Sequence, residues 1–286
     1  MQPITFHRPR SLEEAFALLE QHGDDARLMA GGTALVVMLK QSLLAADQLI
    51  SLDAIPGLGG IRQEPDGLHI GALTRHREVE TSPAVKHAAP LLADVYRHVA
   101  TVRIRNVATV GGGLAHADPA QDPPAAFITL DARVRLVSRR GDRVVAVADL
   151  ATDYYQTLIE PDELLTEVIV PAVAPGTRTA YLKFLPRTAD DYATIAAAAA
   201  GRVENGVCRD VRVALIAAAS TPVHATEVER AIEGKEPTPD NIRHAAEAVV
   251  GQVDPLSDFR GSSAYKRDMA VVFTRRALEN VFGPAG

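Results

Sequence analysis

The chain of 286 residues is long enough for one large domain or two ordinary ones, with a core that needs no disulfide or metal. Apolar residues make up 47% of it and charged residues 23%, and 36 acidic against 30 basic side chains give a pI of about 5.9, which argues against a broad electropositive face for nucleic acid. The single cysteine, Cys208, excludes a disulfide framework and any zinc or iron–sulfur site held by cysteines of this chain alone.

Targeting signals are missing from the sequence. Residues 1–10 lack the apolar core of a signal peptide, and no stretch approaches the about 18 consecutive apolar residues of a membrane-spanning helix. We therefore expect a cytoplasmic protein with no transmembrane segment.

The first forty residues predict a helix, a strand, a glycine turn and a second helix. A capping box that begins at Ser11 predicts a helix over residues 12–21, and residues 27–30 are short and apolar enough for a buried strand. The Gly31–Gly32 turn follows, and Thr33 is a fair N-cap for a helix that ends at residue 40. Because glycine lets backbone N–H groups approach a ligand, and a helix N-terminus adds positive partial charge, this order suits an anion site.

The next part of the chain leads to a second glycine cluster, Thr109–Gly113. The expected elements before it are a strand over 48–52, a hairpin that pairs 61–63 with 68–70, and two helices over 78–100 that are separated at Pro90. Two glycine turns can grip one diphosphate from opposite sides. The alternative is that each cluster is only a tight turn.

After the second cluster, the pattern predicts a proline-stiffened loop, a short helix and several hairpins. The expected elements are a loop over 118–124, a helix to residue 130, a hairpin of 134–137 with 144–147, a domain boundary at 171–176, a hairpin of 192–203 with 207–219, and helices over 224–233, 238–251 and 262–281. Asn205–Gly206 joins the last two strands, and this dipeptide is a strong hairpin signal. The alanine run 196–200 is therefore expected as a strand, against its own propensity.

Seven segments in one order carry a more specific signal. They are Ala30–Ala34, Thr109–Gly113, Ala115–Asp122, Asp162–Leu165, Tyr181–Lys183, Asp191–Ala193 and Arg260–Ser262. Together they make the chain resemble, from end to end, the FAD-binding medium subunits of molybdenum hydroxylases, a group that includes aerobic carbon monoxide dehydrogenase and xanthine dehydrogenase. The family carries Ala-Gly-Gly-x-Ser and Thr-Ile-Gly-Gly-Asn in the first two segments. Ala34 and Gly113 therefore lack side-chain donors to the diphosphate, which predicts a somewhat looser grip through backbone N–H groups.

The resemblance implies an α+β fold in two domains. Residues 1–175 would form a two-lobed FAD-binding domain of the vanillyl-alcohol-oxidase (PCMH) type, with lobes of about 1–55 and 56–175. Residues 176–286 would form a C-terminal domain with an antiparallel sheet and helices. Non-covalent FAD would take electrons from [2Fe-2S] clusters in a small partner subunit and pass them to an external acceptor. A large partner subunit would carry the molybdopterin cofactor, and the complex would be a dimer of heterotrimers.

The resemblance also implies the cofactor-binding residues, and no catalytic residue or metal ligand. They are Ala30, Gly31, Gly32, Thr33, Ala34, Thr109, Val110, Gly111, Gly112, Gly113, Asp122, Leu165, Lys183 and Tyr192. Asp122 would accept hydrogen bonds from sugar or ribityl hydroxyls, or else cap the following helix. Leu165 would contact the adenine or the ring edge, or pack in the core. Tyr192 would lie against the flavin ring. Lys183 would pair with a phosphate, lie near the reduced ring, or be a surface lysine.

Three other interpretations remain open at this point. His116, Asp118 and Asp122 could form a crude metal triad, although a fourth ligand is missing. The chain could be a stand-alone FAD-dependent oxidase or dehydrogenase, although no substrate base beside the ring can be named. It could also be a non-catalytic assembly subunit with a decayed flavin site, for which Ala34 and Gly113 are the only arguments.

Overall fold

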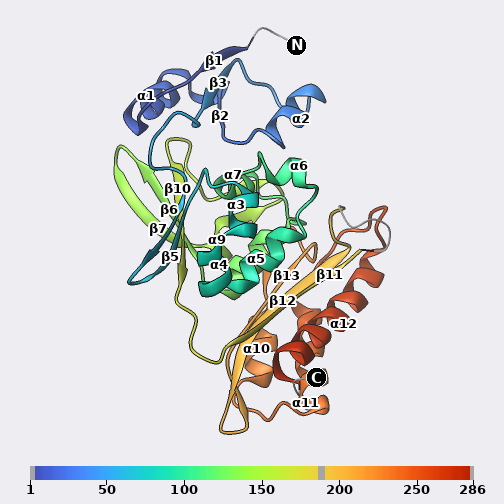
Figure 1. The fold of residues 1–286 in the computed structure, drawn as a ribbon. Helices are drawn as coiled ribbons and strands as arrows, with labels where there is room; N and C mark the ends of the chain where they lie inside the picture. The colour runs from blue at the N-terminus through green and yellow to red at the C-terminus, as the bar shows by residue number, and fades with distance from the viewer. Residues whose placement is uncertain (1–3, 186–190, 284–286) are drawn as a thin grey trace.

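The N-terminal lobe is a small parallel sheet with helices. The computed structural model describes residues 4–185 and 191–283. The elements of this lobe are β1 (Thr5–His7), α1 (Leu12–His22), β2 (Ala26–Met29), α2 (Leu35–Lys40) and β3 (Gln48–Ser51), with strand order β1-β3-β2. The lobe lies at one end of the molecule (Figure 1). The predicted first helix is confirmed, because the Ser11 hydroxyl accepts from the Glu14 N–H at its start.

The second lobe is an antiparallel five-stranded sheet covered by short helices. Its strands are β4 (Ile61–Glu64), β5 (Gly67–Gly71), β6 (Arg133–Ser138), β7 (Gly141–Ala146) and β10 (Leu164–Pro171), in the order β4-β5-β10-β6-β7. The remaining elements are α3 (His76–Thr81), α4 (Pro83–Ala88), α5 (Pro90–Arg97), α6 (Val102–Arg105), α7 (Val110–His116), α8 (Asp122–Thr129), α9 (Val147–Leu150) and the hairpin β8 (Ala151–Asp153) with β9 (Gln156–Thr157). A single apolar core, which includes Tyr96 and Phe127, joins the sheet to these helices.

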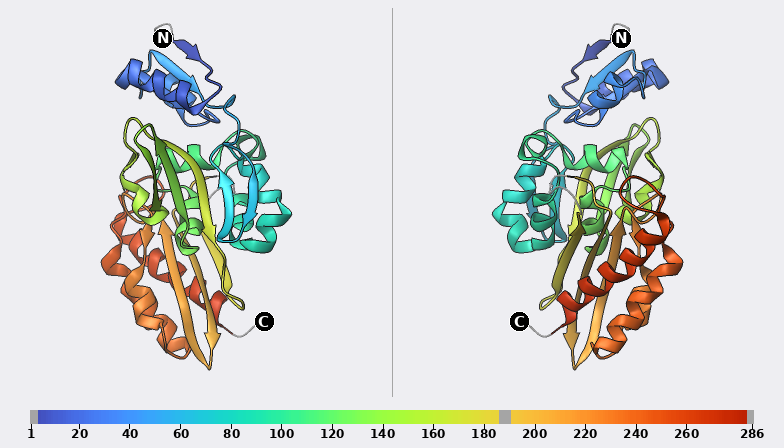
Figure 2. Two further views of the ribbon diagram at one scale, coloured as in Figure 1. Left: turned by 90° about the vertical axis from the view of Figure 1, so that its left-hand side faces the viewer. Right: turned by 90° about the vertical axis from the view of Figure 1, so that its right-hand side faces the viewer.

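The C-terminal part is a four-stranded antiparallel sheet with helices. Its elements are β11 (Arg178–Phe184), β12 (Ile195–Glu204), β13 (Val207–Ile216), β14 (Val223–His224), α10 (Thr226–Ile232), α11 (Pro239–Glu247), a 3-10 segment (Ala248–Gln252) and α12 (Ser263–Phe282). The side views show these helices together on one side of the long strands (Figure 2). No helix within residues 4–185 and 191–283 has the length and apolar composition to cross a bilayer.

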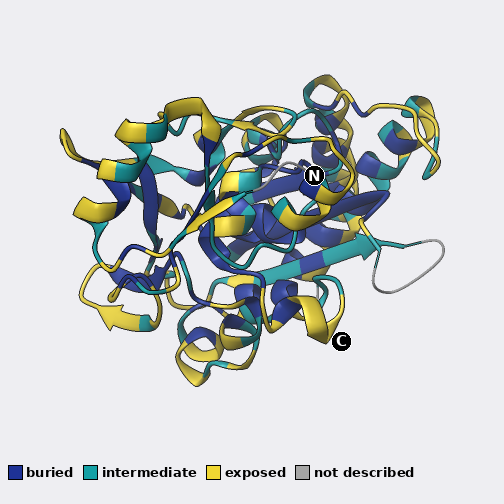
Figure 3. Cartoon of the chain, turned by 90° about the horizontal axis from the view of Figure 1, so that it is seen from above, coloured by how far each residue is buried: buried dark blue, intermediate teal, exposed yellow. Residues whose placement is uncertain are grey.

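The alanine run is a strand, as predicted, and its packing explains why. Ala196 and Ala198 belong to the core shared with α8, whereas Ala197 and Ala199 belong to the core under α12. The alanine stretch of β12 is therefore covered on both faces. The interior strands of the molecule are largely in the buried colour (Figure 3). Small side chains let both layers approach the strand closely, so tertiary packing overrides the helix propensity of alanine. Asn205 and Gly206 both have positive φ, which fits the expected hairpin turn.

Three sequence predictions were wrong in detail. Ala34, not Thr33, occupies the N-cap position of α2, and no side chain caps that helix. Residues 78–100 lie in three helices instead of two, because Ser82–Pro83 breaks the segment as Pro90 does. The loop expected over 118–124 is shorter, since α8 already begins at Asp122 and places two prolines in its first turn, where their missing N–H groups cost nothing.

Candidate functional site

A cavity of about 600 Å³ collects most of the predicted site residues. Its lining includes the turn after β2, the start of α7, the start of α8, the bulged start of β10 and the segment before β12. The predicted residues on its wall are Ala30, Gly31, Gly32, Thr33, Ala34, Thr109, Gly111, Gly112, Gly113, Asp122, Leu165 and Tyr192. Val110 and Lys183 do not line it. Val110 packs in the core, and Lys183 lies behind Asp122.

The first glycine turn lines this cavity and carries free hydrogen-bond donors. Among the described residues, the backbone N–H groups of Gly31, Gly32, Thr33 and Ala34 find no acceptor. A Cβ on Gly31 would lie 2.2 Å from the carbonyl oxygen of Val107, so the turn passes directly against the chain before α7. Gly32 has φ +69°, which favours glycine. The sequence therefore folds this turn into a run of unpaired donors, the arrangement that binds an anion.

The second glycine cluster does not offer unpaired backbone donors like those of the first turn, although the sequence predicted that both clusters would bind the diphosphate. Its amides are already used: Val110 N–H donates to Thr74 O at 3.0 Å, Gly111 N–H to Ala72 O at 2.8 Å, and Gly112 N–H to the Thr109 hydroxyl at 3.2 Å. A Cβ on Gly111 would lie 2.5 Å from the Ala72 Cβ. These glycines therefore allow α7 to pack against the segment after β5. They shape the wall of the cavity, while the first turn supplies the free donors.

Asp122 contributes a buried carboxylate to the cavity wall. Its Oδ2 accepts from Lys183 Nζ at 2.9 Å, and its Oδ1 accepts a short hydrogen bond from the Tyr181 hydroxyl. Lys183 also donates to His98 O at 3.0 Å. Burial raises the pKa of Asp122 above its usual range, and the nearby Lys183 charge opposes that rise. Lys183 is thus neither a surface lysine nor a free cation. It is the counter-charge of Asp122.

Two tyrosines form the aromatic part of the wall, and only Tyr192 was predicted. The Arg260 guanidinium lies 5.6 Å from the Tyr192 ring centroid, a cation–π contact. The unpredicted Tyr155 packs its ring 5.2 Å from that of His116 and donates its hydroxyl to Asp118 at 3.3 Å. Tyr155 has φ +55°, a strained conformation for a non-glycine residue in the β8–β9 turn. Two adjacent tyrosines in a polar turn were the only signal in the sequence.

His76 is a second unpredicted residue of the wall. Its Nε2 lies 3.1 Å from the carbonyl oxygen of Thr109, which can only accept, so this nitrogen carries the ring proton. Burial lowers the pKa of His76 to about 4. The ring is therefore neutral at physiological pH and fixes the start of α7 next to the cavity.

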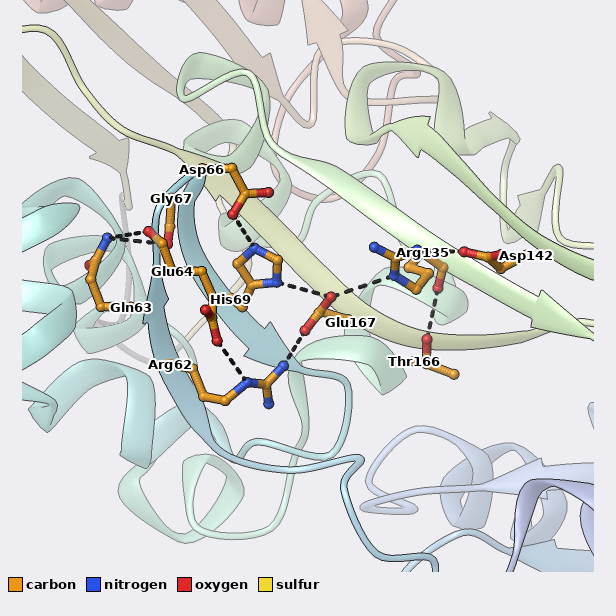
Figure 4. Close-up of polar contacts among 10 residues, drawn as sticks. All are labelled: Arg62, Gln63, Glu64, Asp66, Gly67, His69, Arg135, Asp142, Thr166 and Glu167. Carbon is orange, nitrogen blue, oxygen red and sulfur yellow. Dashed lines mark hydrogen bonds and ion pairs between the residues drawn. The ribbon is translucent and has the colours of Figure 1, made fainter.

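A separate polar cluster lies on the five-stranded sheet, centred on Glu167 of β10 (Figure 4). Glu167 pairs with Arg62 at 2.5 Å and with His69 Nδ1 at 3.1 Å, and the other ring nitrogen of His69 lies 2.9 Å from Asp66. The neighbouring Val168 points into the core, so alternation places Glu167 on the opposite sheet face. Across residues 4–185 and 191–283, no group of three or more His, Cys, Asp or Glu side chains is arranged to hold a metal. The cluster is a network of ion pairs.

Comparisons with known proteins match nearly the whole chain. Residues 2–173 match the family described as FAD binding domain in molybdopterin dehydrogenase, and residues 180–281 match the CO dehydrogenase flavoprotein C-terminal domain. The chain is 37% identical to the carbon monoxide dehydrogenase medium chain of Hydrogenophaga pseudoflava, over 96% of this chain and 95% of that one. It is 34% identical to the glyceraldehyde dehydrogenase medium chain of Sulfolobus acidocaldarius, over 97% and 98%.

Solved structures agree with this match. The carbon monoxide dehydrogenase of Hydrogenophaga pseudoflava has a chain that superposes with a TM-score of 0.95 at 38% identity, covering 98% of this chain and 97% of that one. Quinoline 2-oxidoreductase from Pseudomonas putida 86 gives a TM-score of 0.91 at 31% identity, covering 97% and 96%. These similarities confirm the α+β fold class that the sequence predicted.

Proposed function

The chain belongs to the family of FAD-binding medium subunits of molybdenum hydroxylases, and we propose that it binds FAD non-covalently in the cavity beside the Gly31–Ala34 turn. As a medium chain it is an oxidoreductase subunit with FAD as its cofactor, and it works in a complex with large and small subunits. The single cysteine agrees with iron–sulfur clusters and a molybdenum cofactor in those partners. Bound FAD supplies one- and two-electron redox chemistry, and the protein supplies its binding and electrostatics.

The residues of the wall fit the parts of this cofactor. The four unpaired amides of Gly31–Ala34 would donate to the diphosphate, and this observation carries the proposal. Asp122 would accept from sugar or ribityl hydroxyls, and Leu165 would supply apolar contact. Tyr192 would lie against the ring system and exclude water from it. Lys183 would act on the cofactor through Asp122, since its ammonium group is already paired.

The division into domains 1–175 and 176–286 is supported by the two family matches, which leave a gap between residues 173 and 180. We propose that the FAD takes electrons from [2Fe-2S] clusters of the small subunit and gives them to an external acceptor. We further propose a cytoplasmic dimer of heterotrimers.

A visible absorption spectrum tests the proposal directly. The full chain, purified and then incubated with FAD, should show a flavin spectrum that persists after gel filtration, with one FAD per chain. Purification with its partner subunits should add molybdenum and iron, and the mass of that complex tests the dimer of heterotrimers. A chain that stays colourless after incubation with FAD would overturn the proposal and favour a decayed site. Turnover of a small alcohol or amine by the isolated chain would favour a stand-alone oxidase.

A further inference from the structure

The buried carboxylate of Asp122 is held from outside its own domain. Asp122 begins α8, within the FAD-binding match of residues 2–173, whereas Tyr181 and Lys183 lie on β11, within the C-terminal match of residues 180–281. Tyr181 and Lys183 are two residues apart on one strand, so their side chains point to the same face. Each donates to a different oxygen of Asp122.

All three side chains are almost completely removed from water. The exposed fraction is 3% for Asp122 and 7% for Tyr181, and 3% for the side chain of Lys183. A buried ion pair rarely stabilises a fold more than well-packed apolar residues would, because desolvation offsets the Coulombic attraction. The position of this trio next to the cavity suggests a different purpose, since Asp122 lines the cavity while its two donors lie behind it.

The two donors leave free acceptor positions on the carboxylate of Asp122, a residue that lines the cavity. A carboxylate has about four lone-pair positions, and the two donors from β11 occupy one on each oxygen. With both oxygens fixed, the carboxylate has one orientation relative to the cavity. A ligand hydroxyl would then meet an acceptor that is already charged and aligned, so that binding costs little reorganisation.

We propose that Tyr181 is a positioning residue for FAD: through its hydrogen bond to Asp122, the C-terminal domain orients the acceptor for the cofactor's hydroxyl groups. This inference rests on the proposed function. It assigns the C-terminal domain a part in the flavin site beyond the contact of Tyr192. The proposed contacts of the glycine turn and of Tyr192 with FAD do not depend on the hydrogen bond from Tyr181 to Asp122.

The substitution Tyr181→Phe tests the inference, because it keeps the ring and removes only the donor. Oδ1 of Asp122 then loses its partner, and a hydrogen bond to a charged group is typically worth about a 10- to 100-fold change in affinity. We expect the Kd for FAD, titrated into the full-length chain, to rise by that factor. Tyr265→Phe is the matched control, since the Tyr265 hydroxyl contacts no polar group among the described residues and should leave the Kd unchanged.

Two further measurements separate positioning from a general loss of packing. The Tyr181 hydroxyl favours the ionised form of Asp122, so the Kd of Tyr181→Phe should begin to rise at a higher pH than that of wild type as the pH is lowered toward the raised pKa of Asp122. In the Asp122→Asn background, Tyr181→Phe should cause no additional loss. If Asp122→Asn does not fold, the pH series on Tyr181→Phe alone still decides.

The outcomes are distinct. Wild-type affinity and pH dependence in Tyr181→Phe, or a full additional loss in the Asp122→Asn background, would overturn the positioning role while FAD binding by wild type stands. Failure of the wild-type chain to bind FAD would overturn the proposed function itself.

Discussion

Gly31 is the position where a single methyl group should damage the proposed FAD site most. In Gly31→Ala, the new Cβ would lie 2.2 Å from Val107 O, whereas ordinary contact begins near 3.4 Å. The turn and the chain before α7 must therefore separate by about 1 Å, in an interior packed as densely as a crystal. Overpacking of this kind costs about 1–3 kcal/mol. The same displacement moves the unpaired amides of the turn away from the diphosphate, so we expect FAD affinity to fall about tenfold or more.

Urea unfolding and FAD titration measure the two effects separately. Gly32→Ala should be milder in packing, because its Cβ would contact Val36 and Met29 at 3.4 and 3.5 Å, although its φ of +69° adds about 1–2 kcal/mol of backbone strain. Gly251→Ala is the matched control, since a Cβ there meets nothing within 4 Å, and both properties should match wild type. A Gly31→Ala chain with wild-type stability and affinity would refute the close approach and the role of the turn.

Three further predictions concern single side chains. Ala34→Ser restores the family's hydroxyl and should tighten FAD binding by up to about tenfold in titrations; an unchanged Kd would mean that the hydroxyl does not reach the ligand. Asp122→Asn leaves Lys183 buried without a counter-charge and should cost about 3–5 kcal/mol in urea unfolding, much of it recovered by adding Lys183→Met; no recovery would contradict the pairing. Burial lowers the pKa of His69, but hydrogen bonds and charge from its two carboxylate partners outweigh burial and raise the pKa overall. The stability that the His69 ion pairs contribute is therefore complete below about pH 6.5 and is lost as the pH rises through the raised pKa. His69→Gln should flatten that pH dependence of unfolding, and an unaltered slope would exclude His69 as its source.

Local signals in the sequence were enough for the elements that depend on neighbouring residues. The Ser11 N-cap and the Asn205–Gly206 turn each fix a short segment by hydrogen bonds or backbone angles within a few residues. Strands β10 and β11 were not predicted, because their place depends on partners far along the chain. β10 pairs with both β5 and β6, and no turn signal joins it to either.

Dependence on partners far along the chain also explains which parts of the candidate site were missed. The resemblance identified residues by motif, and twelve of the fourteen line one cavity. It did not show that the amides at Gly111 were already bonded to Ala72, since that contact joins segments that only the fold brings together. It also did not indicate Tyr155, whose place on the wall depends on the β8–β9 turn. The sequence motifs identified the site residues, but tertiary contacts decide which of their hydrogen-bonding groups remain free for a ligand.

The two glycine clusters illustrate this distinction, because similar sequences have different physical roles. Gly31–Ala34 lies between β2 and α2 and keeps its amides unpaired, whereas Val110–Gly112 forms the first turn of α7 and donates its own amides to the protein. A diphosphate needs unpaired donors, and a cavity wall needs close packing. Substitutions should therefore separate the two roles. Alanine at Gly31 affects binding and packing together, whereas alanine at Gly111, 2.5 Å from the Ala72 Cβ, should lower stability first and affinity only through displacement of α7.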